Sequence, residues 1–203
     1  MRSIRPLIER AKEASRILSG LDPSRKTSVL LDMAKAIKDN HEIIIKLNGE
    51  DMRNGKAMHL APLAIDQLLL DEHRLGEISE VIADIAALPE PLILTDDKGV
   101  MANPRGVVAI VYESRPHITA DTACLYFKAG NAVILRGGKE AFHSNTVIAS
   151  ILCDVLDSHG LPRELITLIP ATDRVVMAEL LKLNDLVDML IPCGSEGLIQ
   201  YVV

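Results

Sequence analysis

The sequence predicts an α/β protein in which a helical N-terminal layer is followed by a partial doubly wound parallel sheet. Apolar residues recur every three or four positions over residues 1–91, whereas short β-branched runs alternate with helical intervals over residues 92–203. Hydrophobic residues make up 48% of the chain and charged residues 25%, so a sizeable core can form. We therefore expect a helical segment, 1–91, and an α/β segment, 92–203.

The residues that start and stop helices define the first segment. Gly20 ends the first helix, and Asp22 caps the second, which has Pro23 in its first turn. The turn dipeptide Asn54-Gly55 is expected to end the third helix. Helices are thus expected over residues 4–18, 23–37, 41–52, 62–70 and 72–87.

The second segment alternates strands with helices. Short apolar runs without charges are typical of strands buried on both faces of a parallel sheet. The intervals between them are long enough for right-handed crossover helices, which makes the sheet doubly wound. Strands are expected over residues 106–112, 131–135, 165–169 and 186–191, and helices over residues 119–128, 144–158 and 173–183, with a last helix from about Ser195.

Composition excludes several classes of function. The formal net charge is −6 and the sequence pI is about 5.5, which argues against a nucleic-acid-binding surface. With no Trp, three Tyr and two Phe, the chain also lacks the aromatic area of a base-stacking platform or a membrane belt. No apolar run approaches the ~20 residues that span a membrane. The N-terminus has no apolar signal region, so we expect a cytoplasmic protein.

The cysteines and histidines match no metal-binding pattern, so no metal site is expected. Cys124 and Cys153 lie in apolar helical stretches and are expected to be buried and unreactive. Cys193 precedes a helix N-terminus, whose dipole lowers the pKa of a thiol. Two interpretations of Cys193 therefore stay open, a reactive thiolate and an ordinary thiol. His117 and His143 lie at or near the loops that follow strands. Each is interpreted either as a ligand contact or as a capping or surface histidine.

Ligands of an open α/β sheet bind where its strands end, so the loops after the strands are the candidate sites. These loops span residues 113–117, 136–140, 170–173 and 192–197. Arg136 and Lys139 flank a Gly-Gly turn, and two cations there suit a ribose 2′-phosphate, which favours NADP over NAD. The alternative is an ordinary turn followed by a solvated helix start. Gly194 and Ser195 suit a phosphate, with a simple helix cap as the alternative.

These same loops resemble a known family. The resemblance is carried by VYESRP at 111–116, KAGNAVILRGG at 128–138, HSN at 143–145 and EGLI at 196–199. Such runs are similar to those of the γ-glutamyl phosphate reductases (glutamate-5-semialdehyde dehydrogenases), in the aldehyde dehydrogenase superfamily. The resemblance covers only the N-terminal half of such an enzyme. It implies NADPH-dependent reduction of L-glutamate 5-phosphate to the semialdehyde and phosphate, a step of proline biosynthesis.

The resemblance also implies roles for individual residues, which fall into two groups at the strand ends. Cofactor contacts, to the adenosine ribose and the pyrophosphate, are implied for Arg136, Gly137, Gly138, Lys139, Gly194 and Ser195. A loop toward the reaction centre that binds the acidic substrate is implied for Glu113, Ser114 and Arg115.

The sequence also departs from the family pattern. The family's nucleophilic cysteine lies beyond the match, after Val203, so no catalytic residue is expected in this chain. Lys139 stands where serine is usual and Cys193 where arginine is usual. A strand pair at residues 95–103 is expected to be shortened. Two other readings stay open: a catalytically inactive dinucleotide-binding fragment, or an assembly fragment whose sheet edge pairs with another chain, as in a homo-oligomer.

Overall fold

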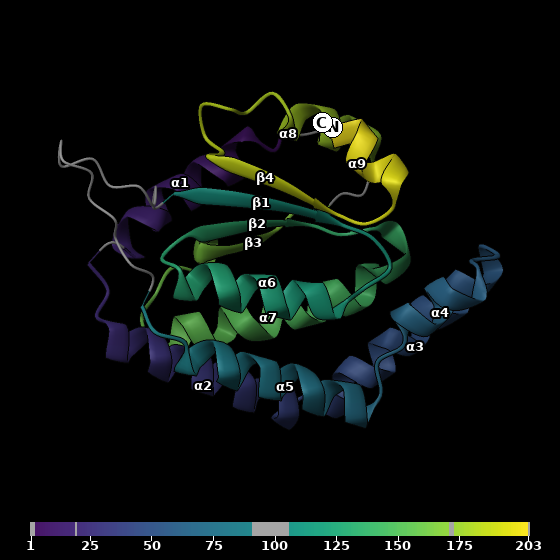
Figure 1. Ribbon diagram of the computed structural model, residues 1–203, viewed down its shortest axis with the longest axis horizontal. Coiled ribbons are helices and arrows are strands. Elements are labelled where there is room, and N and C mark those ends of the chain that lie inside the picture. Colours follow the sequence, from purple (N-terminus) through teal and green to yellow (C-terminus); the bar gives the residue numbers. More distant parts are fainter. Residues whose placement is uncertain (1–2, 19, 91–105, 171–172, 203) are drawn as a thin grey trace.

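A four-stranded parallel sheet with helices on both faces forms the centre of the molecule (Figure 1). The structure is a computed structural model that describes residues 3–18, 20–90, 106–170 and 173–202. Its N-terminal helices are α1 (Arg5–Leu18), α2 (Pro23–Asp39), α3 (His41–Ala57), α4 (Pro62–Leu68) and α5 (Glu72–Ala87).

The remaining elements alternate as the sequence predicts. They are β1 (Val107–Tyr112), α6 (His117–Lys128), β2 (Ala132–Arg136), η1 (Lys139–Ala141), α7 (Phe142–Ser158), η2 (Arg163–Leu165), β3 (Ile166–Leu168), α8 (Arg174–Leu180), β4 (Met189–Cys193) and α9 (Glu196–Val202). The sheet order is β3-β2-β1-β4, and all three pairings are parallel. The predicted fold class, a helical layer with a partial doubly wound parallel sheet, is confirmed.

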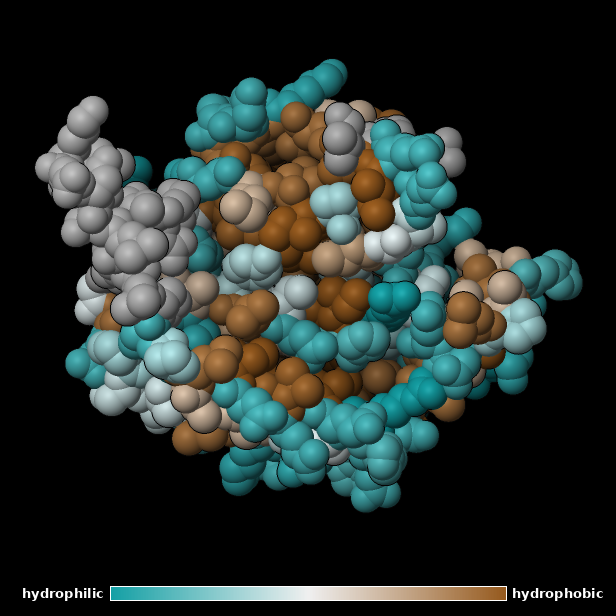
Figure 2. All heavy atoms as spheres, in the orientation of Figure 1, coloured by the Kyte–Doolittle hydropathy of each residue, from teal (hydrophilic) through white to brown (hydrophobic). Residues whose placement is uncertain are grey.

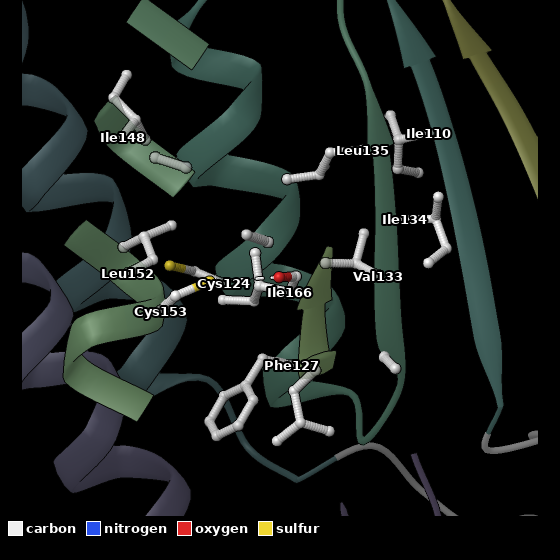
Figure 3. Packing of buried hydrophobic residues seen from close by; sticks show 14 of the residues in the cluster. Ile110, Cys124, Phe127, Val133, Ile134, Leu135, Ile148, Leu152, Cys153 and Ile166 are labelled. Carbon is white, nitrogen blue, oxygen red and sulfur yellow. Dashed lines mark hydrogen bonds between the residues drawn. The ribbon is translucent and has the colours of Figure 1, made fainter. Parts of the chain in front are cut away.

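Helices cover the sheet in layers (Figure 1). Helices α6 and α7 lie on one face, with α2 and α5 in a further layer outside them, and α1, α8 and α9 lie on the other face. Every residue of β1 is buried, as expected for a central strand with helices on both sides. Figure 3 shows Val133 and Leu135 of β2 pointing toward the α6–α7 layer and Ile134 pointing away from it, which is the alternation of a strand.

Most bounds differ from the predictions by no more than two residues, and α8 ends at Leu180 rather than at residue 183. Larger differences at α3 and β4 have physical reasons. Helix α3 continues through Asn54-Gly55 and ends at Ala57. Gly55 faces α4 closely, since a Cβ on it would stand 3.0 Å from Ile65 Cδ1 and 3.1 Å from Leu68 Cδ2. The glycine lets α4 pack closely on α3, and this contact outweighs the local turn preference. Strand β4 begins at Met189 and ends at Cys193, whereas the prediction was 186–191. It includes Pro192, which an edge strand tolerates.

Buried charges join the helical layer to the sheet layer. Lys26 of α2 and Lys128 of α6 are both buried, and their ammonium groups lie 2.7 and 3.2 Å from the Glu90 carboxylate. One cluster of buried apolar side chains also includes residues of both predicted segments. The division near residue 91 and the shortened strand pair at 95–103 stay predictions, since residues 91–105 lie outside the described part. No helix in the described ranges is long and apolar enough to cross a membrane.

Candidate functional site

The candidate site lies at the carboxyl edge of the sheet, where β1, β2 and β4 end. The chain passes from β1 to β2 and β3 on one side, and then returns to place β4 on the other side of β1. The strand order therefore reverses between β1 and β4, and ligands of open α/β sheets bind in the crevice at such a point. Tyr112 of β1 is paired with Cys193 of β4, so the loops that follow these strands start side by side.

Glu113 and Ser195 meet across this crevice. The Glu113 carboxylate accepts a hydrogen bond from the Ser195 hydroxyl at 3.0 Å and lies 3.4 Å from the Ser195 amide nitrogen. Gly194 and Ser195 are both exposed. The predicted substrate residue Glu113 thus contacts the predicted pyrophosphate residue Ser195, and a negatively charged oxygen already occupies donors that suit a phosphate.

A second carboxylate fixes the loop after β1. Buried Glu140 accepts hydrogen bonds from the Ser114 amide at 2.6 Å and the Ser114 hydroxyl at 3.0 Å. Ser114 has a φ of 48°, a conformation that costs energy in a non-glycine residue. A Cβ on Gly138 would stand 2.0 Å from the Glu140 carboxylate, so glycine leaves room for this contact. The loops after β1 and β2 are therefore held together by Glu140, which sequence reasoning had not included among the site residues.

Three cations belong to the same edge. Arg136 is the last residue of β2 and is half-buried, with its Cα paired with that of Val111. Lys139 and Arg115 are exposed. Arg115 lies close enough to His117 to lower the pKa of that imidazole, although burial is the larger cause. The loops after β1, β2 and β4 are thus brought together as the sequence predicts, while the roles of their residues stay predictions.

Beneath Gly137 lies a buried polar network. The Tyr112 hydroxyl lies 2.7 Å from Thr119 Oγ1, and Thr119 donates a hydrogen bond to Asn145 Oδ1 at 3.0 Å. A Cβ on Gly137 would stand 2.1 Å from Asn145 Nδ2, so the β2 loop rests directly on this network. Burial raises the pKa of Tyr112 well above its usual range, so the hydroxyl stays protonated.

The N-terminus of α7, which follows the β2 loop, is capped by a residue of another helix. Fully buried Asp51 of α3 accepts hydrogen bonds from the amides of His143 and Ser144 at 3.1 and 2.7 Å, and from the Ser144 hydroxyl at 2.6 Å. Asn48, one turn earlier on α3, donates to Ser144 Oγ at 3.0 Å. Sequence reasoning missed both residues, although two polar side chains spaced i, i+3 on a buried helix face were a usable signal.

The thiols differ in exposure. Cys124 and Cys153 are buried as predicted, and burial is the main cause that raises the pKa of Cys153 to about 11 and moves that of Cys124 still higher. Neither is a thiolate at neutral pH. Cys193 is half-buried at the end of β4, and its reactivity stays untested. The predicted loop at 170–173 includes residues 171–172, which lie outside the described part of the chain.

The order of strands and the crevice between β1 and β4 define a Rossmann-like α/β protein of the dinucleotide-binding class. The family model of the aldehyde dehydrogenase family matches residues 2–203, and the chain belongs to that family.

Comparisons with individual proteins are more specific than the family match. The chain is 43% identical to a gamma-glutamyl phosphate reductase of Sulfurovum sp., over 96% of this chain and 50% of the relative, and 42% identical to one of Dehalococcoides mccartyi, over 95% and 47%. The crystal structure of the Thermotoga maritima gamma-glutamyl phosphate reductase matches with a TM-score of 0.91 at 26% identity, covering 99% of this chain and 51% of that one. The chain spans about half the length of these relatives.

Proposed function

We propose that this protein takes part in the NADPH-dependent reduction of L-glutamate 5-phosphate to L-glutamate 5-semialdehyde and phosphate, a step of proline biosynthesis in the cytoplasm. The observation that carries the proposal is the meeting of three loops at the β1–β4 crevice, in a chain whose relatives are named gamma-glutamyl phosphate reductases. As a nicotinamide dinucleotide, the cofactor would supply a hydride to the acyl carbon.

The residues present fit such a cofactor. The amide and hydroxyl of Ser195 already hold a carboxylate oxygen and can donate in the same way to a pyrophosphate oxygen. Gly194 is exposed and leaves the backbone open to close approach. Arg136 and Lys139 lie beside the Gly-Gly turn of the β2 loop and would pair with a 2′-phosphate, which is the basis for preferring NADP over NAD.

The remaining roles concern binding and orientation. Arg115 would hold an acidic group of the substrate, and Glu140 keeps the Ser114 turn of the same loop in place. The described thiols with raised pKa, Cys124 and Cys153, are poor nucleophiles. The proposed role of the loops after β1, β2 and β4 is therefore to bind the cofactor and orient the substrate.

A titration of the chain with NADPH, followed by nicotinamide fluorescence, tests the proposal. We expect saturable binding that is tighter than for NADH and at least about tenfold weaker in Arg136→Ala, because a charge-assisted contact to the 2′-phosphate is lost. Lys38→Ala removes an exposed cation of α2 and serves as the control, with unchanged affinity. The absence of binding, or equal loss in both variants, would contradict the proposal.

A second candidate function is assembly with another chain. Strand β4 is the edge of the sheet in the described part of the chain, and Met189 at its start is 52% exposed. Figure 2 shows hydrophobic residues gathered on this face over β1 and β4. An open edge with apolar residues favours pairing with a second copy. Gel filtration over a range of concentrations tests this candidate: dimers that form with rising concentration support it, and a compact monomer at every concentration excludes it.

A further inference from the structure

A cavity of about 330 Å³ lies between the end of α4, the first half of α5 and the start of α6. Its lining includes Arg74 and Glu77 of α5, His117 and Asp121 of α6, and the apolar side chains of Leu70 and Ile78. His117 is the first residue of α6 and follows Arg115 and Pro116, so the cavity adjoins the loop after β1. A volume of this size suits a molecule as small as an amino acid.

Asp121 has a carboxylate oxygen without a partner. Its Oδ1 is buried and accepts no hydrogen bond from the described residues. Burial raises the pKa of this carboxyl to about 6, so it is ionised at neutral pH, although it is largely removed from water. Buried carboxylates are normally paired or hydrogen-bonded, because an isolated one loses its hydration without compensation. Asp121 also lines the cavity, so a ligand that donates hydrogen bonds there compensates the carboxylate for its lost hydration.

The charges around the cavity favour a cation. Asp66, Glu77 and Asp121 are acidic, while Arg74 is the basic residue of the lining. Arg74 is engaged by Asp66, whose carboxylate accepts a hydrogen bond from the guanidinium at 2.9 Å. Burial, Arg115 and Arg74 lower the pKa of His117, so its imidazole is neutral at pH 7. The lining therefore carries net negative charge.

We propose that this cavity binds the α-ammonium group of the amino-acid substrate, with the Asp121 carboxylate as its counter-ion. The inference rests on the proposed function, which supplies a substrate with an ammonium group at one end and an acyl phosphate at the other. With its ammonium beside Asp121, the substrate extends along Leu70 and Ile78, which also line the cavity. Asp121 then selects an amino acid over an acyl compound that lacks the amine.

The direct test uses two small probes, L-glutamate and glutarate, which differ in the α-ammonium group. Each is titrated into the ¹⁵N-labelled chain at pH 7.5, and the amide shifts of α5 and α6 are followed. We expect saturable shifts with L-glutamate and affinity at least about tenfold weaker with glutarate, since one charge-assisted contact is lost. This comparison needs no variant, so it holds even if a substituted chain does not fold.

Variants and pH sharpen the test. In Asp121→Asn the affinity for L-glutamate should fall about tenfold or more, while Asp84→Asn, which removes an exposed carboxylate of α5, should leave it unchanged. Lowering the pH from 7.5 to 5 should weaken binding in the unsubstituted chain, because Asp121 is protonated below about pH 6. The other charged or titratable groups of the lining are Asp66, Arg74, Glu77 and His117, and all are retained in Asp121→Asn.

The outcomes separate the cavity from the proposed function. Equal affinity for L-glutamate and glutarate, no saturable shifts, or equal loss in the Asp121 and Asp84 variants would overturn the ammonium site. An NADPH titration of the same sample reports on the cofactor site alone. NADPH binding without discrimination between the two probes overturns only the cavity assignment, whereas discrimination without NADPH binding supports the cavity and contradicts the cofactor role.

Discussion

The two sets of polar residues near the carboxyl edge of the sheet differ in how they are satisfied. At the surface, exposed Ser195 donates to the Glu113 carboxylate, a contact that an incoming anion can replace. Below it, Asp51 is fully buried and accepts two amides and a hydroxyl at the start of α7. Substitutions at the buried Asp51 should therefore change the free energy of unfolding, whereas substitutions at the exposed Glu113–Ser195 contact should change ligand binding.

The largest effect is expected from Asp51→Ala. It leaves the half-buried amide of His143 and the buried amide of Ser144 without their acceptor at a helix N-terminus, so the free energy of unfolding should fall by about 2–4 kcal/mol. Urea unfolding measures it. Asp84→Ala, on the exposed face of α5, is the control and should stay within about 0.5 kcal/mol of the parent chain. Similar losses of unfolding free energy in both variants would contradict a stabilising role of the Asp51 cap.

A smaller loss of stability is expected from Gly137→Ala. The new Cβ would meet Asn145 Nδ2 and force the Tyr112–Thr119–Asn145 network to shift, at a cost of about 1–3 kcal/mol. Gly76→Ala is the matched control, because Gly76 lies inside α5 and a Cβ there would meet no neighbouring atom within 4 Å, so alanine should stabilise by about 0.5–1 kcal/mol. Opposite signs in thermal unfolding support the account, and two losses of equal size would not.

The half-buried Glu90 and its buried partners Lys26 and Lys128 should make the free energy of unfolding depend on pH. Burial raises the pKa of Glu90, but its bonds to Lys26 and Lys128 outweigh this and lower it below the ordinary 4.5. A carboxyl whose folded pKa is lowered stabilises the fold above its unfolded pKa, and this contribution is lost as the pH falls through the folded value. The difference in melting temperature between the parent chain and Glu90→Gln should therefore be largest near pH 7 and shrink below about pH 4. A difference that stays constant with pH would contradict this assignment.

The smallest effect on stability is expected at the exposed contact between Glu113 and Ser195. Glu113→Gln removes the negative charge that competes with a phosphate for the Ser195 donors, so NADPH should bind a few-fold more tightly, with a change in unfolding free energy within about 0.5 kcal/mol. Glu80→Gln, an exposed residue of α5, controls for net charge. If NADPH binds more weakly to the Glu113 variant, then Glu113 supports the cofactor rather than competing with it.

Local patterns predicted the sheet and its ends because both depend on neighbouring residues. The run from Val107 to Tyr112 is apolar and β-branched, and a strand followed by a polar turn indicates the edge where ligands bind. This was enough to single out Arg136, Ser195 and their loops. The prediction that Asn54-Gly55 ends the third helix was wrong, because the packing of α4 on α3 outweighs the local turn preference.

The supports of the site were beyond local patterns because their partners are far apart in the chain. Asp51 caps a helix that begins about 90 residues later, and Asn145 reaches Thr119 across two elements. The i, i+3 spacing of Asn48 and Asp51 indicates a shared helix face, but neither this spacing nor the HSN run at 143–145 identifies the distant partner. The Asp121 cavity likewise forms only when α5 and α6 pack together. Such contacts follow from tertiary structure rather than from sequence neighbourhood.

The most direct measurement of the central claim is a map of NADPH binding on the ¹⁵N-labelled chain. The account predicts that the amides of Ser114, Gly137, Gly138 and Ser195 shift together and saturate at one affinity, while those of α3 stay in place. Shifts confined to other elements, or no saturable shifts at any of these four amides, would contradict the assignment of the β1–β4 crevice as the dinucleotide site.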